Sequence, residues 1–256
     1  MSTQILAIAN QKGGVAKTTT VASLGAALAE LGKSVLIVDL DPQACLTFSL
    51  GIDPEDLELS VHHVLTKGVD ASEVIIETDD GVDLLPATIE LARAEADLLT
   101  RTGREYVLRA ALEETEGYDW VLLDCPPSLG VLTVAALTAA TGVLIPLQCE
   151  TLSHRGVGQL LDTVHDVRRF TNKGLQVWGV LPTLYDGRTN HARTVLETIS
   201  ETYGLDVIEP PIPKSIRFAE APAAGRSILA TARRTKGADA YRDVAASLTE
   251  KAGSGA

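Results

Sequence analysis

Two adjacent glycines, a lysine three residues later and a threonine directly after it suit the binding of a phosphate chain, in the segment Gln11-Lys12-Gly13-Gly14-Val15-Ala16-Lys17-Thr18-Thr19. Gly13 and Gly14 would let successive backbone N–H groups point inward with no Cβ in the way. Lys17 would bring positive charge to the outer phosphates, and Thr18 would offer a hydroxyl to Mg2+. A glycine-rich turn with an incidental lysine is the alternative. The strand predicted at residues 5–9 and the helix predicted at 18–31 provide the context that a phosphate-binding loop requires.

This loop departs from the common pattern G-x-x-x-x-G-K-[ST]. Gln11 and Ala16 stand where that pattern has glycine, and Lys12 is an additional lysine. Lys12 has no obvious place beside its own loop's phosphates, but it could reach a nucleotide held by a facing subunit, so that dimerisation would depend on ATP. The methyl group of Ala16 could crowd the phosphates or restrict φ, and ATPase activity is the property this change would affect.

Two predicted apolar strands end in carboxylates. Asp39 and Asp41 follow the strand at residues 34–38, and Asp124 follows the strand at 120–123. An aspartate of ordinary pKa is a poor proton acceptor from water, so we expect Asp41 to position the attacking water. Asp124, with Thr18, is the predicted Mg2+ ligand, because magnesium keeps several waters and needs few protein ligands. For Asp39 a structural role at the strand end is favoured over a chemical one.

These motifs resemble the deviant Walker A family of ParA and MinD ATPases, and within it the ParA/Soj-type partition ATPases. The signature K-G-G-x-G-K-T is matched except at Ala16, D-x-D-P-Q is matched at residues 39–43, and the family's Asp-Cys-Pro-Pro-Ser stretch occurs at 124–128. The resemblance implies ATP and Mg2+ as cofactors, slow hydrolysis and an ATP-dependent homodimer. It assigns catalysis to Lys12, Lys17 and Asp41, and nucleotide binding to Lys12, Gly13, Gly14, Val15, Ala16, Lys17, Thr18 and Thr19.

The resemblance continues through residues 179–190 and 211–222, and thus covers nearly the whole chain. In the family the second of these stretches passes the adenine base, which implies contacts from Pro213 and Ser215. Family members also bind DNA without sequence preference through basic residues that align with Arg188 and Arg217, with Lys214 adjacent. The implied biological role is the partitioning of chromosome, plasmid or other cargo, with a ParB-like protein stimulating hydrolysis.

The overall charge is at odds with a nucleic-acid partner, but its distribution is not. The chain has 22 Lys and Arg against 34 Asp and Glu, a formal charge of −12. Between residues 211 and 238, however, there are six basic residues and only one acidic residue. A solvated basic surface explains this count as well as a DNA-binding surface does. The family resemblance favours DNA.

Cysteines and two polar residues leave further alternatives. Cys45, Cys125 and Cys149 are odd in number and lack C-x-x-C spacing, so neither a disulfide framework nor a zinc site is expected. Cys125 suggests an iron–sulfur site like that of the related nitrogenase iron protein, but a small buried thiol is the favoured interpretation. Gln148 and Glu150 follow another predicted strand, and both a place near the nucleotide or dimer interface and ordinary loop polarity explain them.

The expected fold is α/β, with a mostly parallel sheet flanked by helices, in a single P-loop ATPase domain of residues 1–251 followed by a flexible tail at 252–256. The chain of 256 residues is 45% hydrophobic, enough for a substantial core. Residues 51–80 are assigned no chemistry. The remaining predicted strands lie at 82–85, 142–147 and 177–181, and the remaining predicted helices at 104–114, 131–140, 154–170 and 192–203.

A cytoplasmic location is expected, because the first strand begins within a few residues of the start and leaves no room for a signal peptide or a preceding DNA-reading domain. The DNA binding that the resemblance implies adds association with the nucleoid. No run of apolar residues is long enough to span a membrane. Two rival functions remain. A MinD-like switch on a membrane surface would need a basic amphipathic C-terminal helix, whereas residues 238–251 are of mixed character. A nucleotide-gated scaffold with negligible turnover is the other, suggested by Ala16.

Overall fold

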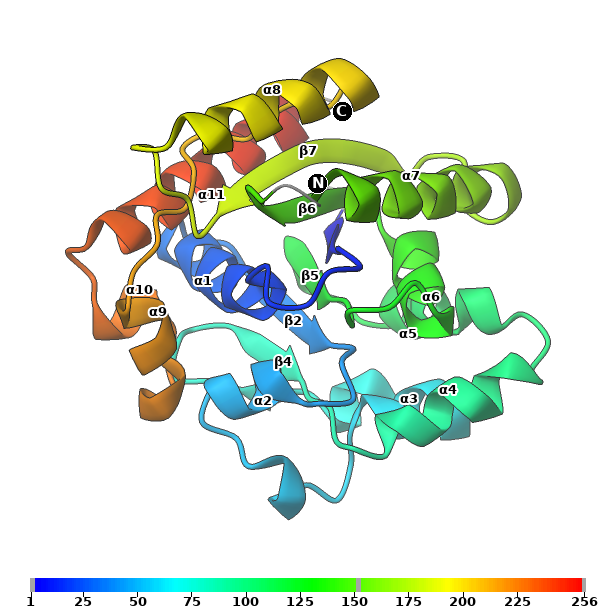
Figure 1. The fold of residues 1–256 in the computed structure, drawn as a ribbon. Coiled ribbons are helices and arrows are strands. Elements are labelled where there is room, and N and C mark those ends of the chain that lie inside the picture. Colours follow the sequence, from blue (N-terminus) through cyan, green and yellow to red (C-terminus); the bar gives the residue numbers. More distant parts are fainter. Residues whose placement is uncertain (1–2, 151–152, 255–256) are drawn as a thin grey trace.

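Seven strands form one sheet in the part of the chain that the computed structural model describes, residues 3–150 and 153–254. The strand order is β3-β4-β2-β5-β1-β6-β7, and every neighbouring pair is parallel except β3 with β4 (Figure 1). The strands are β1 Gln4–Ile8, β2 Val35–Asp39, β3 Ile76–Glu77, β4 Asp83–Leu85, β5 Trp120–Asp124, β6 Gly142–Gln148 and β7 Gln176–Thr183.

The prediction of a mostly parallel sheet flanked by helices is confirmed. All six predicted strands are present, each end within two residues of its predicted position. The additional strand β3 has two residues and pairs at the sheet edge, which is too short for a recognisable pattern. The helices are α1 Lys17–Glu30, α2 Cys45–Ser49, α3 Val61–Lys67, α4 Leu91–Leu99, α5 Val107–Glu113, α6 Val131–Ala139, α7 Ser153–Phe170, α8 Asn190–Tyr203, α9 Arg217–Glu220, α10 Ile228–Thr231 and α11 Lys236–Ser254, with short 3-10 helices at Pro54–Asp56, Ala71–Glu73, Arg104–Tyr106 and Pro222–Ala224.

Alternate strand residues build two separate cores. In β2, Leu36 and Val38 face a core that α3 to α7 cover, whereas Val35 and Ile37 face a core that α1, α2, α10 and α11 cover. Figure 1 shows α1 and α11 on one side of the sheet and α5, α6 and α7 on the other. Because both faces of the central strands are buried, these strands appear in the sequence as continuous apolar runs.

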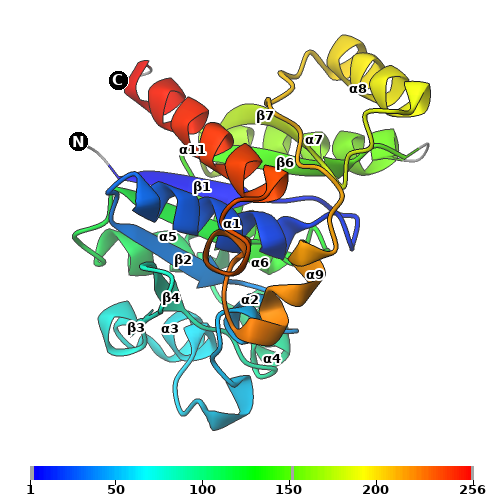
Figure 2. The ribbon, with the colours of Figure 1, turned by 90° about the vertical axis from the view of Figure 1, so that its left-hand side faces the viewer.

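Helix α1 is enclosed because α11 lies along it (Figure 2). A Cβ at Gly25 would lie 3.1 Å from Cγ2 of Ile37, so this glycine lets α1 approach the sheet closely. On the other side, the hydroxyls of Thr20 and Tyr241 are 3.0 Å apart, and both side chains are fully buried. Helix α11 runs to Ser254, so residues 252–254 of the expected flexible tail are helical, because Ala252 packs against this core.

Candidate functional site

The loop between β1 and α1 contains two residues in the left-handed backbone region. Gly14 has a φ of 74° and Ala16 a φ of 63°, both in the left-handed region. A Cβ added at Gly13 or Gly14 would meet no protein atom within 4 Å, so the bare backbone faces solvent and not a packed neighbour. Ala16 is the residue that precedes α1, and its conformation costs an alanine about 1 kcal/mol that a glycine would avoid. The expected restriction of φ at this residue therefore takes the form of a strained backbone.

Two buried side chains outside the predicted set anchor this loop. Asn10 donates from Nδ2 to the carbonyl of Pro146 at 2.8 Å and accepts from the amide of Lys12 at 3.0 Å. Thr183, at the end of β7, donates to the carbonyl of Val15 at 3.0 Å. Asparagine just before a glycine-rich turn is a recognisable signal for the Asn10 contact. Thr183 has no local signal, because its partner is 168 residues away.

The two lysines of the loop occupy different environments. Lys17 is 7% exposed, and its Nζ donates to the carbonyl of Lys12 at 3.3 Å. Burial lowers the pKa of the Lys17 ammonium, and the carboxylate of Asp124 opposes that shift. Lys12 is more exposed and forms an ion pair with Glu150, just beyond β6. The loop thus presents one cation inside the site and one at its rim.

Asp124 carries the least satisfied polar group of the site. It is the register partner of Asp39 across β5 and β2, and both residues are fully buried. Neither carboxylate oxygen of Asp124 receives a hydrogen bond of good geometry from the described residues, and the Thr18 hydroxyl is the donor nearest to forming one. Burial raises the pKa of Asp124 well above its usual range, repulsion from Asp39 adds to this, and nearby Thr18 and Lys17 oppose it. An unpartnered buried carboxylate beside a threonine hydroxyl fits a hard divalent cation such as Mg2+.

Asp39 and Asp41 differ in their surroundings. Asp39 accepts hydrogen bonds from the amide and the hydroxyl of Thr47, at 2.9 and 2.8 Å, and from the amide of Asp41 at 3.1 Å. Burial raises the pKa of Asp39 to about 6 against these hydrogen bonds. Asp41 is half-buried, and its carboxylate accepts from the amide of Gln43 at 3.0 Å. Asp39 thus holds the start of the loop that carries Asp41, in keeping with a structural role.

Comparison with known proteins relates the chain to a large group of nucleotide-binding proteins. A family model described as an AAA domain matches residues 3–177. "Sporulation initiation inhibitor protein Soj" of Bacillus subtilis is 45% identical over 244 residues, covering 94% of this chain and 96% of that protein. "Chromosome-partitioning ATPase Soj" of Thermus thermophilus is 46% identical over 240 residues, covering 94% and 93%.

The chain belongs to the ParA/Soj family of P-loop ATPases. A solved structure from Mycobacterium smegmatis, titled as cobyrinic acid a,c-diamide synthase with bound ADP and magnesium, has a TM-score of 0.90 and 55% identity and covers 100% of this chain and 97% of its own. The name of that protein refers to amide synthesis, whereas the Soj names refer to partitioning and sporulation.

Residues 179–190 and 211–222, the two later stretches of the family resemblance, lie side by side. The amide of Tyr185 donates to the carbonyl of Ile212 at 2.9 Å, and the amide of Lys214 donates back to Tyr185 at 3.3 Å. Arg188 therefore lies on the loop next to Lys214, and Arg217 begins the following helix α9. Arg188 is 90% exposed and forms an ion pair with Asp186, while Arg217 is 57% exposed and forms an ion pair with Glu220.

Pro213 and Ser215 belong to the same pair of stretches. Pro213 forms an isolated parallel β-bridge with Tyr185. The hydroxyl of Ser215 accepts a hydrogen bond from the amide of Arg217 at 3.3 Å. The expected contacts of both residues with adenine stay predictions. The hydrogen bond of Ser215 to the amide two residues ahead is a local turn contact, which explains a short hydroxyl side chain here without a ligand.

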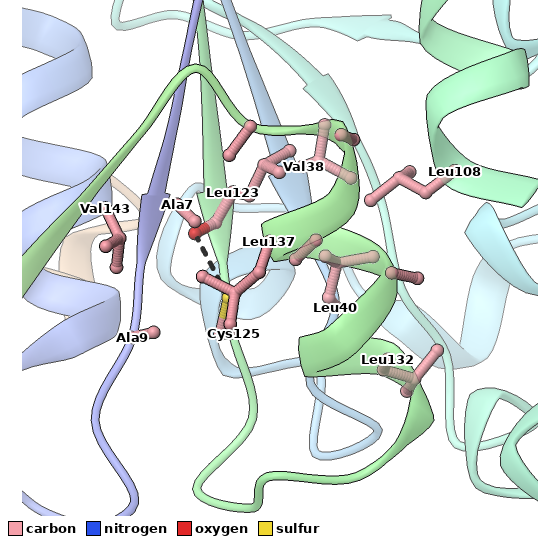
Figure 3. Packing of buried hydrophobic residues seen from close by; sticks show 14 of the residues in the cluster. Ala7, Ala9, Val38, Leu40, Leu108, Leu123, Cys125, Leu132, Leu137 and Val143 are labelled. Atoms are coloured by element: carbon pink, nitrogen blue, oxygen red, sulfur yellow. Dashed lines mark hydrogen bonds between the residues drawn. The ribbon is translucent and has the colours of Figure 1, made fainter. Parts of the chain in front are cut away.

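Cys125 lies in the apolar core and not at a surface that a second subunit could reach. It is 1% exposed, and Figure 3 shows it among Ala7, Ala9, Val143 and Leu137, with its thiol directed to the carbonyl of Leu123. Burial raises the pKa of the Cys125 thiol far above its ordinary value. The buried-thiol interpretation fits this position, because an exposed thiolate is the form that binds a shared cluster.

Within residues 3–150 and 153–254, no helix is both long and apolar enough to cross a bilayer. The same residues contain no group of three or more His, Cys, Asp or Glu side chains arranged to hold a metal. The cation site at Asp124 would thus draw its other ligands from Thr18, phosphate oxygens and water.

Proposed function

We propose that this ATPase is an ATP-switched dimer that hydrolyses ATP slowly and binds DNA without sequence preference, in the partitioning of chromosome, plasmid or other cargo. One observation supports nucleotide and magnesium binding most directly. The buried carboxylate of Asp124 receives no hydrogen bond of good geometry from the described part of the chain, and it lies beside Lys17 and Thr18, next to the loop in which Gly14 and Ala16 have positive φ. Such a buried charge is costly unless a cation completes it.

The loop supplies the phosphate site. Backbone N–H groups of the loop and the positive end of the α1 dipole would bind the phosphate oxygens, from Gly13, Gly14, Val15, Ala16, Lys17, Thr18 and Thr19. Lys17 would move from the Lys12 carbonyl to the outer phosphates, a short displacement for a flexible side chain. Thr18 and Asp124 would hold Mg2+, which supplies charge neutralisation at the transferred phosphate.

Asp41 would position the attacking water. Its carboxylate is half-buried at the end of β2, and its amide is fixed by Asp39, which aims the side chain toward the same edge of the sheet. Lys17→Ala should abolish nucleotide binding or turnover. Asp41→Ala should retain nucleotide binding and trap a DNA-bound dimer, and unchanged phosphate release in Asp41→Ala would contradict the assigned role.

Lys12 would act between subunits. In the monomer its ammonium pairs with Glu150 at the rim, and so it is not directed at its own loop's phosphates. Each subunit would extend Lys12 to the nucleotide of its partner, so ATP favours the dimer over the monomer. Hydrolysis would remove the terminal phosphate whose charge Lys12 neutralises, and the dimer would then dissociate.

The proposed DNA surface consists of Arg188, Lys214 and Arg217. Arginine and lysine side chains would contact DNA phosphates and carry no base information. The logarithm of the DNA affinity should therefore fall with the logarithm of the salt concentration, with a slope of about one per phosphate neutralised. The dimer would present two such surfaces. Pro213 and Ser215 would pass the adenine base in the same stretch, which would couple the two sites. A ParB-like protein is the proposed activator, and a nucleoid-associated cytoplasmic location follows from the DNA role.

An ATP-dependent DNA gel shift across a salt series tests this proposal. Wild type with Mg2+ and ATP should shift DNA, more strongly at low salt, and ADP should not support the shift. Arg217→Glu should weaken the shift and leave ATP-dependent dimerisation intact. Equal DNA affinity in wild type and Arg217→Glu would remove this surface from the proposal.

Three rivals have separate tests. ATP-dependent flotation with anionic liposomes would support a MinD-like membrane switch. Negligible phosphate release from wild type, with ATP bound, would support a nucleotide-gated scaffold. ATP turnover that depends on cobyrinic acid would support the reaction named for the Mycobacterium smegmatis structure. DNA-stimulated turnover without such an acid supports the partition role.

A further inference from the structure

Asn10 lies where three parts of the site meet. It is 3% exposed, it lies two residues beyond the end of β1 at Ile8, and its side-chain amide donates to the carbonyl of Pro146 in β6. A Cβ at Gly156 of α7 would lie 3.3 Å from its Oδ1, so α7 passes the asparagine at a position without a side chain. Asn10 thus joins the phosphate loop to the β6–α7 region.

The orientation of this amide is set by its two partners. Nδ2 faces a carbonyl, which only accepts, and Oδ1 faces the Lys12 amide, which only donates, at 3.0 Å. Asparagine bound to the amide two residues ahead forms an Asx turn. The Lys12 N–H is therefore used within the protein and does not point into the phosphate nest.

We propose that Asn10 is a positioning residue that directs Lys12 away from its own nucleotide and toward the dimer face. This inference rests on the proposed function, in which Lys12 acts on the partner's nucleotide. With its N–H turned to Asn10, the Lys12 residue projects its side chain to the rim, where it meets Glu150.

The hydrogen bond from the Lys12 amide to Asn10 would persist when nucleotide binds, unlike the other two contacts of Lys12. Lys17 donates to the Lys12 carbonyl, and it would leave when a triphosphate offers better acceptors. Glu150 is an exposed ion-pair partner that would exchange for the partner's phosphates. The Asn10 side chain is buried, its hydrogen bond to Lys12 is partly buried, and it takes part in neither exchange, so it keeps the direction of Lys12 through the cycle.

Thr183 offers a matched comparison, because it anchors the same loop at the Val15 carbonyl and not at Lys12. Asn10→Ala removes the hydrogen bonds to the Lys12 amide and the Pro146 carbonyl, and Thr183→Val removes the one to the Val15 carbonyl. The two variants are compared in an Asp41→Ala background, which blocks turnover. Dimer dissociation constants come from sedimentation with Mg2+ and ATP, and monomer affinity for ADP comes from titration calorimetry.

Asn10→Ala should weaken dimerisation about tenfold while changing ADP affinity by less than about twofold, since a lost hydrogen bond of ordinary strength corresponds to about one order of magnitude. Thr183→Val should weaken ADP binding by a similar factor. A merely structural role for Asn10 would lower ADP affinity and dimerisation together, and that result, or unchanged dimerisation, overturns the inference.

Asn10→Ser provides a second variant that keeps a short acceptor for the Lys12 amide. Its dimerisation should be weaker than that of the parent and stronger than that of Asn10→Ala. If the alanine variant unfolds, Asn10→Ser is compared with the parent alone, and dimerisation no weaker than the parent's counts against the inference. A parent protein that stays monomeric at saturating Mg2+ and ATP refutes the proposed switch itself, and the inference falls with it. A parent that dimerises equally with and without Asn10 refutes the inference alone.

Discussion

The ammonium group of Lys12 pairs with the carboxylate of Glu150, which lies 138 residues further along the chain and just beyond β6. The side chains are 37% and 51% exposed, so water screens the pair and its net contribution is about 1 kcal/mol or less. A weak ion pair of this kind holds the Lys12 side chain in the monomer but lets it leave Glu150 when a dimer forms. The pair also connects the phosphate loop to the region between β6 and α7, and gives Glu150 a contact that the sequence alone left undecided.

Glu150→Gln should free Lys12 and strengthen ATP-dependent dimerisation by up to about fivefold, the equivalent of an exposed ion pair. Sedimentation in an Asp41→Ala background measures the change. Glu116→Gln is the control, because this exposed glutamate precedes β5 at the opposite edge of the sheet. Weaker dimerisation in Glu150→Gln would instead assign the carboxylate to the dimer contact itself.

Ala16→Gly should raise the free energy of unfolding by about 1 kcal/mol, because glycine adopts the φ of 63° without the steric cost that alanine pays. Thermal unfolding of nucleotide-free protein measures this. Phosphate release from both proteins then tests the methyl group's effect on turnover. Faster release in the glycine variant indicates crowding by the methyl group, whereas equal and readily measurable rates remove the scaffold rival.

Asp80→Ala should destabilise the protein by about 2 kcal/mol. The Asp80 side chain is 1% exposed and accepts hydrogen bonds from Nε of Arg226 and the amide of Ser227, at 2.5 and 2.6 Å. Losing a buried charged acceptor leaves both donors unpaired, and partial exposure of Arg226 moderates the cost. Asp79→Ala is the matched control, since that side chain is 84% exposed and 3.7 Å from Arg226. Equal unfolding midpoints for the two variants would contradict this account.

Asp39 should make the metal-free protein less stable as pH rises. Its folded pKa of about 6 lies above its ordinary value of 3.8, so its contribution is full below 3.8 and is lost as pH passes 6. Relative to Asp39→Asn, wild type should lose about 3 kcal/mol across that range, the equivalent of about two pKa units. Denaturant unfolding of both proteins without Mg2+ or nucleotide measures the difference. Parallel stability curves would show that Asp39 does not titrate there.

Local pattern determined much of the architecture. Continuous apolar runs predict buried parallel strands, and all six such runs are strands, because residues buried on both faces leave no polar alternation. Segments too short to show a period were missed, among them β3, α2 and α10. Helix α11 was also missed, although it is long, because its mixed composition becomes meaningful only when Tyr241 and Val244 pack into the core beside α1.

Residue type and spacing predicted the glycine-rich loop and the acids after β2 and β5, since these depend on backbone freedom and on charge at strand ends, and the same motifs carried the family resemblance. Tertiary structure decided which groups share an environment. It placed Asp39 directly across from Asp124, paired Lys12 with Glu150 and anchored the loop through Asn10 and Thr183. Burial and long-range contact set these properties, and both arise only when strands distant in sequence become neighbours in the sheet.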